Sequence, residues 1–246
     1  MTNLSKLRVH IAPVGFEIDR IVLPAIQMKA DKVWLIRELN PAKEKARPYI
    51  EKIMVELKKE KIKVEFAESD RSDIFQILKS VKDVFLKEAK NDLYVNVSSG
   101  SKIQAIACMM ACMIFKDSNA TPYYVEPEDY PATKGNQQST GLRNLTELPK
   151  YEIQKPKQEL LDALKIIKDK GGKITKKEIA ILSEKDKIIT INAREENQDQ
   201  ARFASLEANI IQPLSEHWKF VEIEKIGRNR WIKITPEGKN ASEFLI

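Results

Sequence analysis

Apolar residues follow two different patterns in the first half of the chain. Short, nearly continuous apolar runs are separated by longer stretches in which apolar residues recur every three or four positions. The runs are typical of strands buried on both faces of a parallel sheet, and the spaced positions are typical of amphipathic helices. The predicted strands are Leu7–Pro13, Lys32–Leu39, Ile62–Ala67, Asp92–Val97 and Thr121–Val125. The predicted helices between them are Glu17–Met28, Ala42–Lys59, Ser72–Lys87, in which Ser72 is the predicted cap, and Ile103–Phe115.

This alternation of strands and helices predicts right-handed crossovers and a parallel sheet that carries helices on both faces. The predicted strand order is 3-2-1-4-5, as in doubly wound folds. Residues 126–156 interrupt the alternation, because several prolines and glycines surround the polar stretch Lys134–Thr140. We interpret them as a linker or surface excursion with an extra strand near Leu142–Leu148.

The C-terminal part of the chain has a different order of elements. Three helical patterns come first, two short strands follow, and a helix ends the chain. Three helices followed by a hairpin are typical of a winged helix-turn-helix domain. The predicted elements are the helices Lys157–Lys170, Thr175 to about Leu182 and Asp199–Glu216, bent or ended near Pro213, the strands Phe220–Ile226 and Trp231–Thr235, and the helix Pro236–Leu245.

The sequence therefore predicts an α/β chain with two domains. Residues 1–150, including the linker, form a Rossmann-like parallel sheet with helices on both faces, and residues 151–246 form a smaller winged helix-turn-helix domain. The composition, 42% hydrophobic and 32% charged over 246 residues, is that of a globular protein with a real core. We expect no membrane span and no secretory signal, and hence a cytoplasmic protein. The net charge of +6 is too small to predict nucleic-acid binding without local basic patches.

Two loops are predicted to meet between strands one and four, where the strand order reverses and doubly wound sheets bind ligands. The first loop follows strand one, and the second leads from strand four directly into a helix. Hydroxyls, exposed amides and a helix N-terminus suit an anion such as phosphate, and the lysine adds a positive charge. The alternative is a capped turn without a ligand. The candidate ligand-binding residues are Pro13, Val14, Gly15, Phe16, Ser98, Ser99, Gly100, Ser101 and Lys102.

Other kinds of site are weakly indicated. The second loop lacks the spacing of a phosphate-binding Walker A loop, and the first lacks the glycines of a dinucleotide fingerprint. Cys108 and Cys112 fit core packing better than a metal site, and His10 and His217 have no partner in sequence that predicts a catalytic dyad. We therefore expect no metal, no cofactor and no catalytic triad.

The segment Val95–Lys102 (VNVSSGSK) resembles the ligand motif of CRISPR-associated Rossmann-fold (CARF) domains, and Val9–Gly15 resembles their other ligand loop. With a C-terminal winged helix, the whole chain resembles the archaeal CARF transcriptional regulators. The resemblance implies a homodimer that binds cyclic oligoadenylate across its two-fold axis and passes this signal to a domain that binds double-stranded DNA. Some CARF domains also cleave their ligand as metal-independent ring nucleases, a role open to Ser99, Ser101 and Lys102. Two alternatives therefore stay open. The protein could be an enzyme that cleaves its ligand, or its ligand could be a different phosphorylated metabolite.

The winged helix domain carries the candidate DNA contacts. Basic residues alternate at the tip and flanks of the predicted hairpin, where they can reach phosphates or the minor groove. Further basic residues, together with the amide side chain of a glutamine, lie on or near the predicted pair of helices that would meet the major groove. The alternative is an ordinary hairpin with charged side chains in solvent. The candidates are Lys176, Lys177, Arg194, Gln198, Arg202, Lys225, Arg228 and Arg230.

Overall fold

The computed structural model describes residues 5–131, 137–191, 193–227 and 229–246. The chain divides into two compact units, Met1–Gln154 and Lys155–Ile246, and each is described by itself. In the described residues, no helix is both long enough and apolar enough to cross a membrane.

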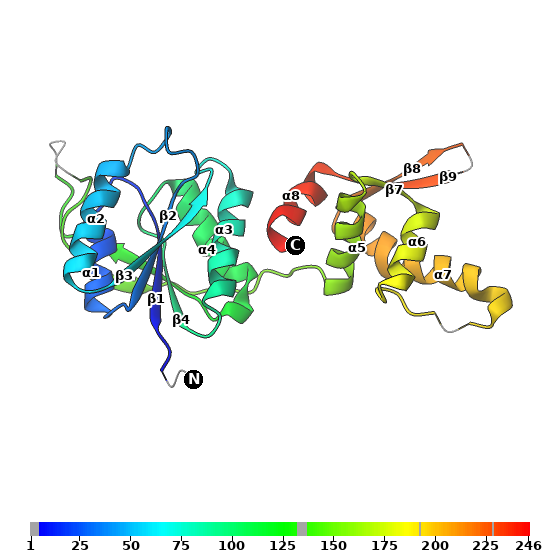
Figure 1. Cartoon of the computed structure of the whole chain (residues 1–246), viewed down its shortest axis with the longest axis horizontal. Helices are drawn as coiled ribbons and strands as arrows, with labels where there is room; N and C mark the ends of the chain where they lie inside the picture. Colours follow the sequence, from blue (N-terminus) through cyan, green and yellow to red (C-terminus); the bar gives the residue numbers. More distant parts are fainter. Residues whose placement is uncertain (1–4, 132–136, 192, 228) are drawn as a thin grey trace. The chain divides into compact units, whose positions relative to one another are not determined.

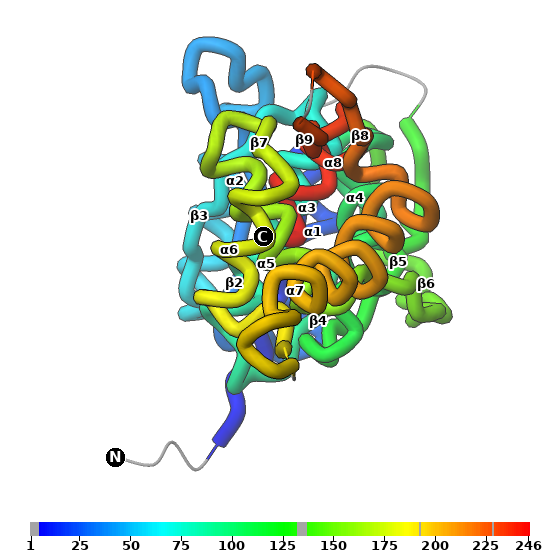
Figure 2. The backbone as a smooth tube through the Cα atoms, turned by 90° about the vertical axis from the view of Figure 1, so that its right-hand side faces the viewer, coloured from blue at the N-terminus to red at the C-terminus, as the bar shows by residue number. Residues whose placement is uncertain are grey.

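The first unit is built on a six-stranded sheet. Its strand order is β3-β2-β1-β4-β5-β6, and β3 and β6 lie at opposite edges (Figure 2). The first five strands are parallel, and β6 pairs antiparallel with β5. The predicted fold class and strand order are therefore confirmed, and β6 is the extra strand predicted near Leu142–Leu148. The strands are β1 (Arg8–Pro13), β2 (Lys32–Glu38), β3 (Lys63–Ser69), β4 (Asp92–Asn96), β5 (Thr121–Glu126) and β6 (Asn144–Glu147).

Helices cover both faces of this sheet (Figure 1). One face packs against α1 (Asp19–Gln27) and α2 (Arg47–Lys59), and the other against α3 (Ile74–Lys87) and α4 (Lys102–Ile114). A short 3-10 helix, η1 (Lys116–Ser118), follows α4. The central strands are buried on both faces, which explains their nearly continuous apolar runs. Because β1 and β4 are neighbouring parallel strands, their carboxyl ends lie side by side, at the end of the sheet where all five parallel strands terminate. This end is called the carboxyl edge of the sheet below.

The helices α1, α2 and α3 all begin later than the sequence predicts, and side-chain hydrogen bonds account for the starts of α2 and α3. The chain from Asn40 to Ala46 is a turn, because the Glu44 carboxylate accepts hydrogen bonds from the backbone amides of Glu38 and Ala46. Such side-chain bonds compete with the helix ladder. The cap of α3 is Asp73, whose carboxylate accepts from the next amides of the helix, whereas the Ser72 hydroxyl donates to Asp70. The prediction of Ser72 as the cap was wrong by one residue.

The second unit is the predicted winged helix domain. Its hairpin strands form a three-stranded sheet in the order β7-β9-β8, and the short β7 was not predicted. The core lies between the helices and this sheet and includes Leu164, Ile179, Leu206 and Ile232. The elements are α5 (Gln158–Asp169), β7 (Lys173–Thr175), α6 (Lys176–Lys185), η2 (Glu195–Asn197), α7 (Gln198–Leu206), β8 (Val221–Ile226), β9 (Asn229–Ile234) and α8 (Pro236–Leu245).

The third helix of this domain continues past Pro213. After α7 it contains two π-helical segments, η3 (Glu207–Ile211) and η4 (Pro213–His217). A proline has no N–H for the ordinary helix ladder, and a π turn widens the helix at such an interruption. The predicted bend near Pro213 is thus a change in helix type. The helix runs from Gln198 to His217, about one residue longer at each end than the predicted Asp199–Glu216.

Candidate functional site

The two predicted ligand loops are in direct contact. The Ser99 hydroxyl donates to the carbonyl oxygen of Pro13 at 2.8 Å. A Cβ atom on Gly15 would lie 3.0 Å from the Cα of Gly100, so the two backbones touch where these side chains are missing. Gly100 has φ +77°, and a Cβ there would lie 2.7 Å from the Cβ of Pro13. The glycines are therefore required by the close approach of the loops and, at Gly100, by the left-handed backbone.

Two of the three loop hydroxyls hold the loop in shape. The Ser98 hydroxyl donates to Asn96 Oδ1 at 2.8 Å and accepts from the Val125 amide at 2.7 Å. The Ser99 hydroxyl is committed to Pro13, as described above. Because both give their protons to the protein, a ligand oxygen that approached them would find no donor. Of the three loop hydroxyls, that of Ser101 is the one that gives its proton to no residue the structure describes.

Ser101 and Lys102 begin α4 at this edge. The Ser101 hydroxyl accepts from the Gln104 amide at 3.2 Å, and the Gln104 side chain accepts from the Ser101 amide at 2.9 Å, which together form a capping box. Lys102 is exposed, and its side chain makes no hydrogen bond or ion pair with any residue that the structure describes. Its ammonium group is thus available for an anion beside the N-terminus of α4.

The other residues of the first loop contribute backbone rather than side chains. Val14 is buried, and Phe16 packs against Tyr49 with ring centres 5.3 Å apart. Both side chains belong to the core beneath α1 and α2. The structure therefore brings Pro13, Gly15 and Gly100 together, and turns the Val14 and Phe16 side chains away from the loop contact.

Two arginines that sequence reasoning missed contact these loops. Arg71 donates to the Val14 carbonyl at 3.1 Å and lies 3.5 Å from Gln104 Oε1. Arg20 donates to the Ser98 carbonyl at 2.9 Å. Arg71 follows the carboxyl end of β3, so the rule that ligands bind at that edge gives a signal for it. Nothing in the local sequence indicates Arg20, which reaches Ser98 from α1.

The chain excursion, residues 126–156, returns to the residues that follow the first loop. Gln137 Oε1 accepts from the amides of Ile18 and Asp19 at 2.8 and 3.0 Å. The amide and hydroxyl of Ser139 both donate to Glu17 Oε2. Burial raises the pKa of the Glu17 carboxyl, although Ser139 and Arg20 partly oppose this shift. The predicted surface excursion is therefore anchored to the residues after the first loop on its return path, while residues 132–136 lie outside the described part.

The histidine and cysteines of this unit are core residues. His10 is buried in β1, with Nδ1 2.9 Å from the Tyr123 hydroxyl, and burial lowers its pKa to about 4. Cys108 and Cys112 are buried in α4, where desolvation raises the pKa of both thiols. Among the described residues, no group of three or more potential ligands of the His, Cys, Asp and Glu types is placed to hold a metal ion.

Two of the candidate DNA contacts are ion-paired inside the winged helix unit. Arg202 pairs with Glu184 and Asp199, each at 2.5 Å, and Lys176 pairs with Glu207. The Arg202–Glu184 and Lys176–Glu207 pairs join α6 to the third helix, whereas Asp199 and Arg202 both lie on α7. A DNA phosphate would therefore have to compete with carboxylates for both cations.

The remaining candidates that the structure describes are exposed. Lys225 and Arg230 lie directly opposite each other on the hairpin. Neither forms an ion pair with a described residue, and the same is true of Lys177 and Arg194. Gln198 is exposed in the first turn of α7, where recognition helices contact base edges. Arg228 lies outside the described residues.

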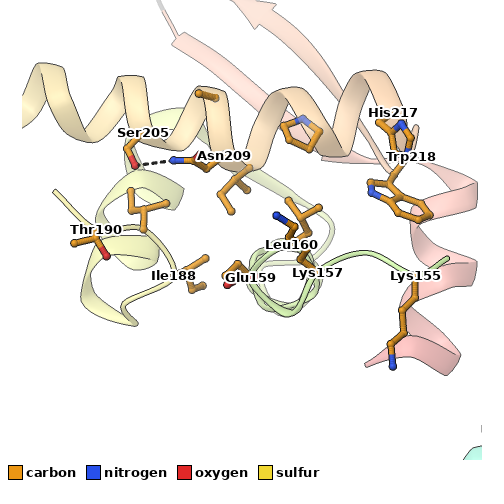
Figure 3. A pocket seen from close by; sticks show the side chains of 14 residues that line it. Lys155, Lys157, Glu159, Leu160, Ile188, Thr190, Ser205, Asn209, His217 and Trp218 are labelled. Carbon is orange, nitrogen blue, oxygen red and sulfur yellow. Dashed lines mark hydrogen bonds between the residues drawn. The ribbon is translucent and has the colours of Figure 1, made fainter. Parts of the chain in front are cut away.

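A groove of about 690 Å³ runs along a side of the third helix, between this helix and the residues around Ile188 and Leu160. Ser205 and Asn209 lie on the helix side of this groove, opposite Ile188 and Leu160, and His217 and Trp218 lie at one end (Figure 3). Asn209 donates to the Ser205 hydroxyl at 3.2 Å. The helix thus presents one side to α6, one to the core and one to this groove, and its first turn is exposed.

Comparisons with known proteins match both units. A family model described as HFX_2341_N-like, N-terminal matches residues 8–130, half of the chain, and a model described as DUF6293 C-terminal winged helix domain matches residues 159–246. A curated relative, "Uncharacterized protein MJ1513" of Methanocaldococcus jannaschii, is 32% identical over 216 residues, which cover 76% of this chain and 64% of the relative. The chain thus spans just under two thirds of that relative's length.

Solved structures give weaker likenesses. Csm6 of Enterococcus italicus, bound to cyclic hexa-2'-fluoro-hexa-dAMP, has a TM-score of 0.44 at 12% identity and covers 87% of this chain and 56% of its own. Protein VC1899 of Vibrio cholerae has a TM-score of 0.42 at 14% identity, with coverages of 96% and 64%. Can2 of Sulfobacillus thermosulfidooxidans, in complex with cyclic tetra-adenylate, has a TM-score of 0.40 at 11% identity, with coverages of 96% and 63%. These scores lie below the level at which a shared fold is inferred.

Proposed function

The chain belongs to the family described as HFX_2341_N-like, N-terminal, and we propose that the protein is a ligand-responsive transcriptional regulator. In this proposal the first unit binds a cyclic oligoadenylate or a related nucleotide, and the winged helix unit binds double-stranded DNA. Ligand binding changes the match between two winged helices and the half-sites of an operator. The observation that carries the proposal is the contact of the Gly15 and Gly100 loops at the N-terminus of α4.

The chemistry at this edge favours an anionic ligand. The first turn of α4 presents backbone amides to solvent, and Lys102 adds an exposed cation beside them. The Ser101 hydroxyl accepts one internal bond and gives its proton to no described residue, so it can donate to a phosphate oxygen. The resemblance of Val9–Gly15 and Val95–Lys102 to the CARF ligand loops narrows the anion to a nucleotide with several phosphates.

A second copy of the chain supplies the other half of the site in this proposal. A ring with several phosphates is larger than one short loop, and a two-fold dimer places two identical loops around it. The exposed face of α4 supports this arrangement. Ile103 and Ile106 follow Lys102 on this helix and are 41% and 53% exposed, although both are large apolar side chains. Paired copies of this face would remove these side chains from water beside the ligand.

Replacing Lys102 by alanine should weaken ligand binding without unfolding the protein. One charge-assisted hydrogen bond contributes ~1.5–3 kcal/mol, so we expect an affinity loss of about 10- to 150-fold for each lysine in contact. Thermal shift with cyclic tri-, tetra- and hexa-adenylate selects the ring, and titration calorimetry measures affinity and stoichiometry. We expect one ring for two chains. The control is Lys90→Ala, which removes another exposed lysine of the first unit. An unchanged affinity for Lys102→Ala would remove this lysine from the site.

Replacing Lys225 and Arg230 together by alanine should weaken binding to all DNA sequences alike. Each lost phosphate contact should reduce the salt dependence of binding, log K against log salt, by about 0.9. Fluorescence anisotropy with a mixed-sequence duplex at several salt concentrations measures this slope. Lys233→Ala is the control on the same hairpin, because Lys233 is already paired with Glu222 and Glu224. If the double variant keeps the wild-type affinity and slope, the hairpin does not contact DNA.

A further inference from the structure

Two tyrosines beside the ligand loops are held by one buried arginine. Tyr130 is 60% exposed and Tyr124 is 36% exposed, whereas Arg20 is only 8% exposed. Arg20 Nη2 donates to the Tyr130 hydroxyl at 2.6 Å and lies 3.4 Å from the Tyr124 hydroxyl. Exposed aromatic side chains that only fill surface area need no such anchor. These two rings converge on a single guanidinium group, which restricts how each can turn.

The same arginine ties the rings to the second ligand loop. Its Nη1 atom donates to the Ser98 carbonyl at 2.9 Å. The amide of Val125, the residue after Tyr124, donates to the Ser98 hydroxyl at 2.7 Å. The Arg20 carbonyl accepts from Asn96 at the end of β4. The rings, the loop and the carboxyl end of β4 are therefore one hydrogen-bonded assembly.

Arg20 meets Tyr130 at its hydroxyl end, and the Tyr130 side chain is largely exposed. The guanidinium carbon is 5.5 Å from the centre of the Tyr130 ring and 5.6 Å from that of Tyr124, while Nη2 is 2.6 Å from the Tyr130 hydroxyl. A guanidinium stacked on a ring would lie closer to the centre than to the hydroxyl. Because Tyr130 is 60% exposed, much of its ring surface lies in solvent.

We propose that Tyr124 and Tyr130 form a stacking platform for a nucleobase of the ligand. This inference rests on the proposed function and adds the group that recognises the base, since the loop and Lys102 bind only the phosphate. Every base has a π face that an aromatic ring can stack on, and flat rings held in place do so with little loss of side-chain freedom. Arg20 holds the platform at a fixed position relative to Ser98 and therefore to the phosphate.

The platform separates a nucleotide from other phosphorylated molecules. A sugar phosphate or an inorganic polyphosphate would reach Lys102 and the α4 amides but would place nothing on the two rings. A nucleotide would gain from both contacts at once. The protein would in this way respond to the base-bearing ligand at concentrations at which simpler phosphates leave it unoccupied.

The test compares Tyr130→Ala, Tyr130→Phe and the control Tyr151→Ala, which removes a 73% exposed tyrosine with no hydrogen bond to the two loops. Cyclic tri-, tetra- and hexa-adenylate are the probes, and titration calorimetry gives the affinity. Loss of one stacked base corresponds to about 5- to 150-fold weaker binding. We expect this loss in Tyr130→Ala, a loss of only a few-fold in Tyr130→Phe, and none in Tyr151→Ala.

The outcomes distinguish the platform from the proposed function. If wild-type protein binds none of the three rings, cyclic oligoadenylate is overturned as the ligand of the proposed function, and the platform for its bases is overturned with it. If wild-type protein binds a ring and Tyr130→Ala binds it equally well, the platform alone is overturned. Equal losses in Tyr130→Ala and Tyr130→Phe would also overturn it, because the hydroxyl bond to Arg20 and not the ring face would then carry the effect.

Discussion

Replacing Gly238 by alanine is expected to unfold the winged helix unit. A Cβ atom at this position would lie 2.1 Å from the carbonyl oxygen of Phe220 and 2.8 Å from its carbonyl carbon. Backbone atoms cannot turn away as the end of a flexible side chain can. The start of α8 is also fixed against the start of β8, because the Thr235 amide donates to the Phe220 carbonyl and the Thr235 hydroxyl to the Lys219 carbonyl. We expect a loss of more than about 3 kcal/mol in the free energy of unfolding of this unit.

Hydrogen exchange followed by mass spectrometry measures this loss in each unit separately. Peptides from residues 158–246 should lose protection in Gly238→Ala, while peptides from residues 8–130 should keep it, because the two units are separately compact. Lys239→Ala, an exposed substitution in the same helix, should change protection by less than ~0.5 kcal/mol. Wild-type protection in the Gly238→Ala peptides would show that α8 and β8 can separate at little cost.

The layout of the first unit follows from patterns that single elements carry. The central strands are buried on both faces, so their sequences are nearly continuous apolar runs. The order β3-β2-β1-β4-β5 was predicted as that of doubly wound folds, in which strands alternate with helices. Elements that depend on a distant partner were harder to predict. The strand β7 has only three residues and exists because Ile174 lies opposite Ile232 of β9. Nothing within three residues distinguishes such a strand from the end of a turn.

In the candidate site, too, the features that single elements determine were predicted, and those that depend on distant residues were not. Gly15 and Gly100 were predicted to come together because both follow strands that end at the same edge of a parallel sheet. The roles of the hydroxyls were not predictable, because they depend on acceptors contributed by other strands, such as the Pro13 carbonyl for Ser99. The anchoring of Tyr130 by Arg20 joins α1 to the chain excursion, and no local pattern relates two residues so far apart in sequence.

Replacing Gly100 by alanine is expected to abolish ligand binding while the first unit remains folded. The left-handed backbone costs alanine ~1–2 kcal/mol. A Cβ atom would also lie 2.7 Å from the rigid ring of Pro13 and 2.9 Å from Gln104 Oε1, so the loop must move away from the first strand. That movement displaces the α4 amides, Ser101 and Lys102 together. Since each charge-assisted bond contributes ~1.5–3 kcal/mol, losing two or more weakens binding by at least about 150-fold.

The matched control for this substitution is Gly171→Ala in the other unit. Gly171 has φ +79°, close to the +77° of Gly100, but a Cβ atom there would have nothing within 4 Å. The loss of stability in Gly171→Ala therefore measures the backbone penalty alone. The additional loss of stability in Gly100→Ala measures the clash at the contact between the two loops. Chemical denaturation gives both stabilities, and calorimetry with the ring selected by thermal shift gives the affinities. Because the clash lies at the contact of the two loops, a Gly100→Ala protein that binds the ring as tightly as wild type would place the ligand elsewhere on the first unit.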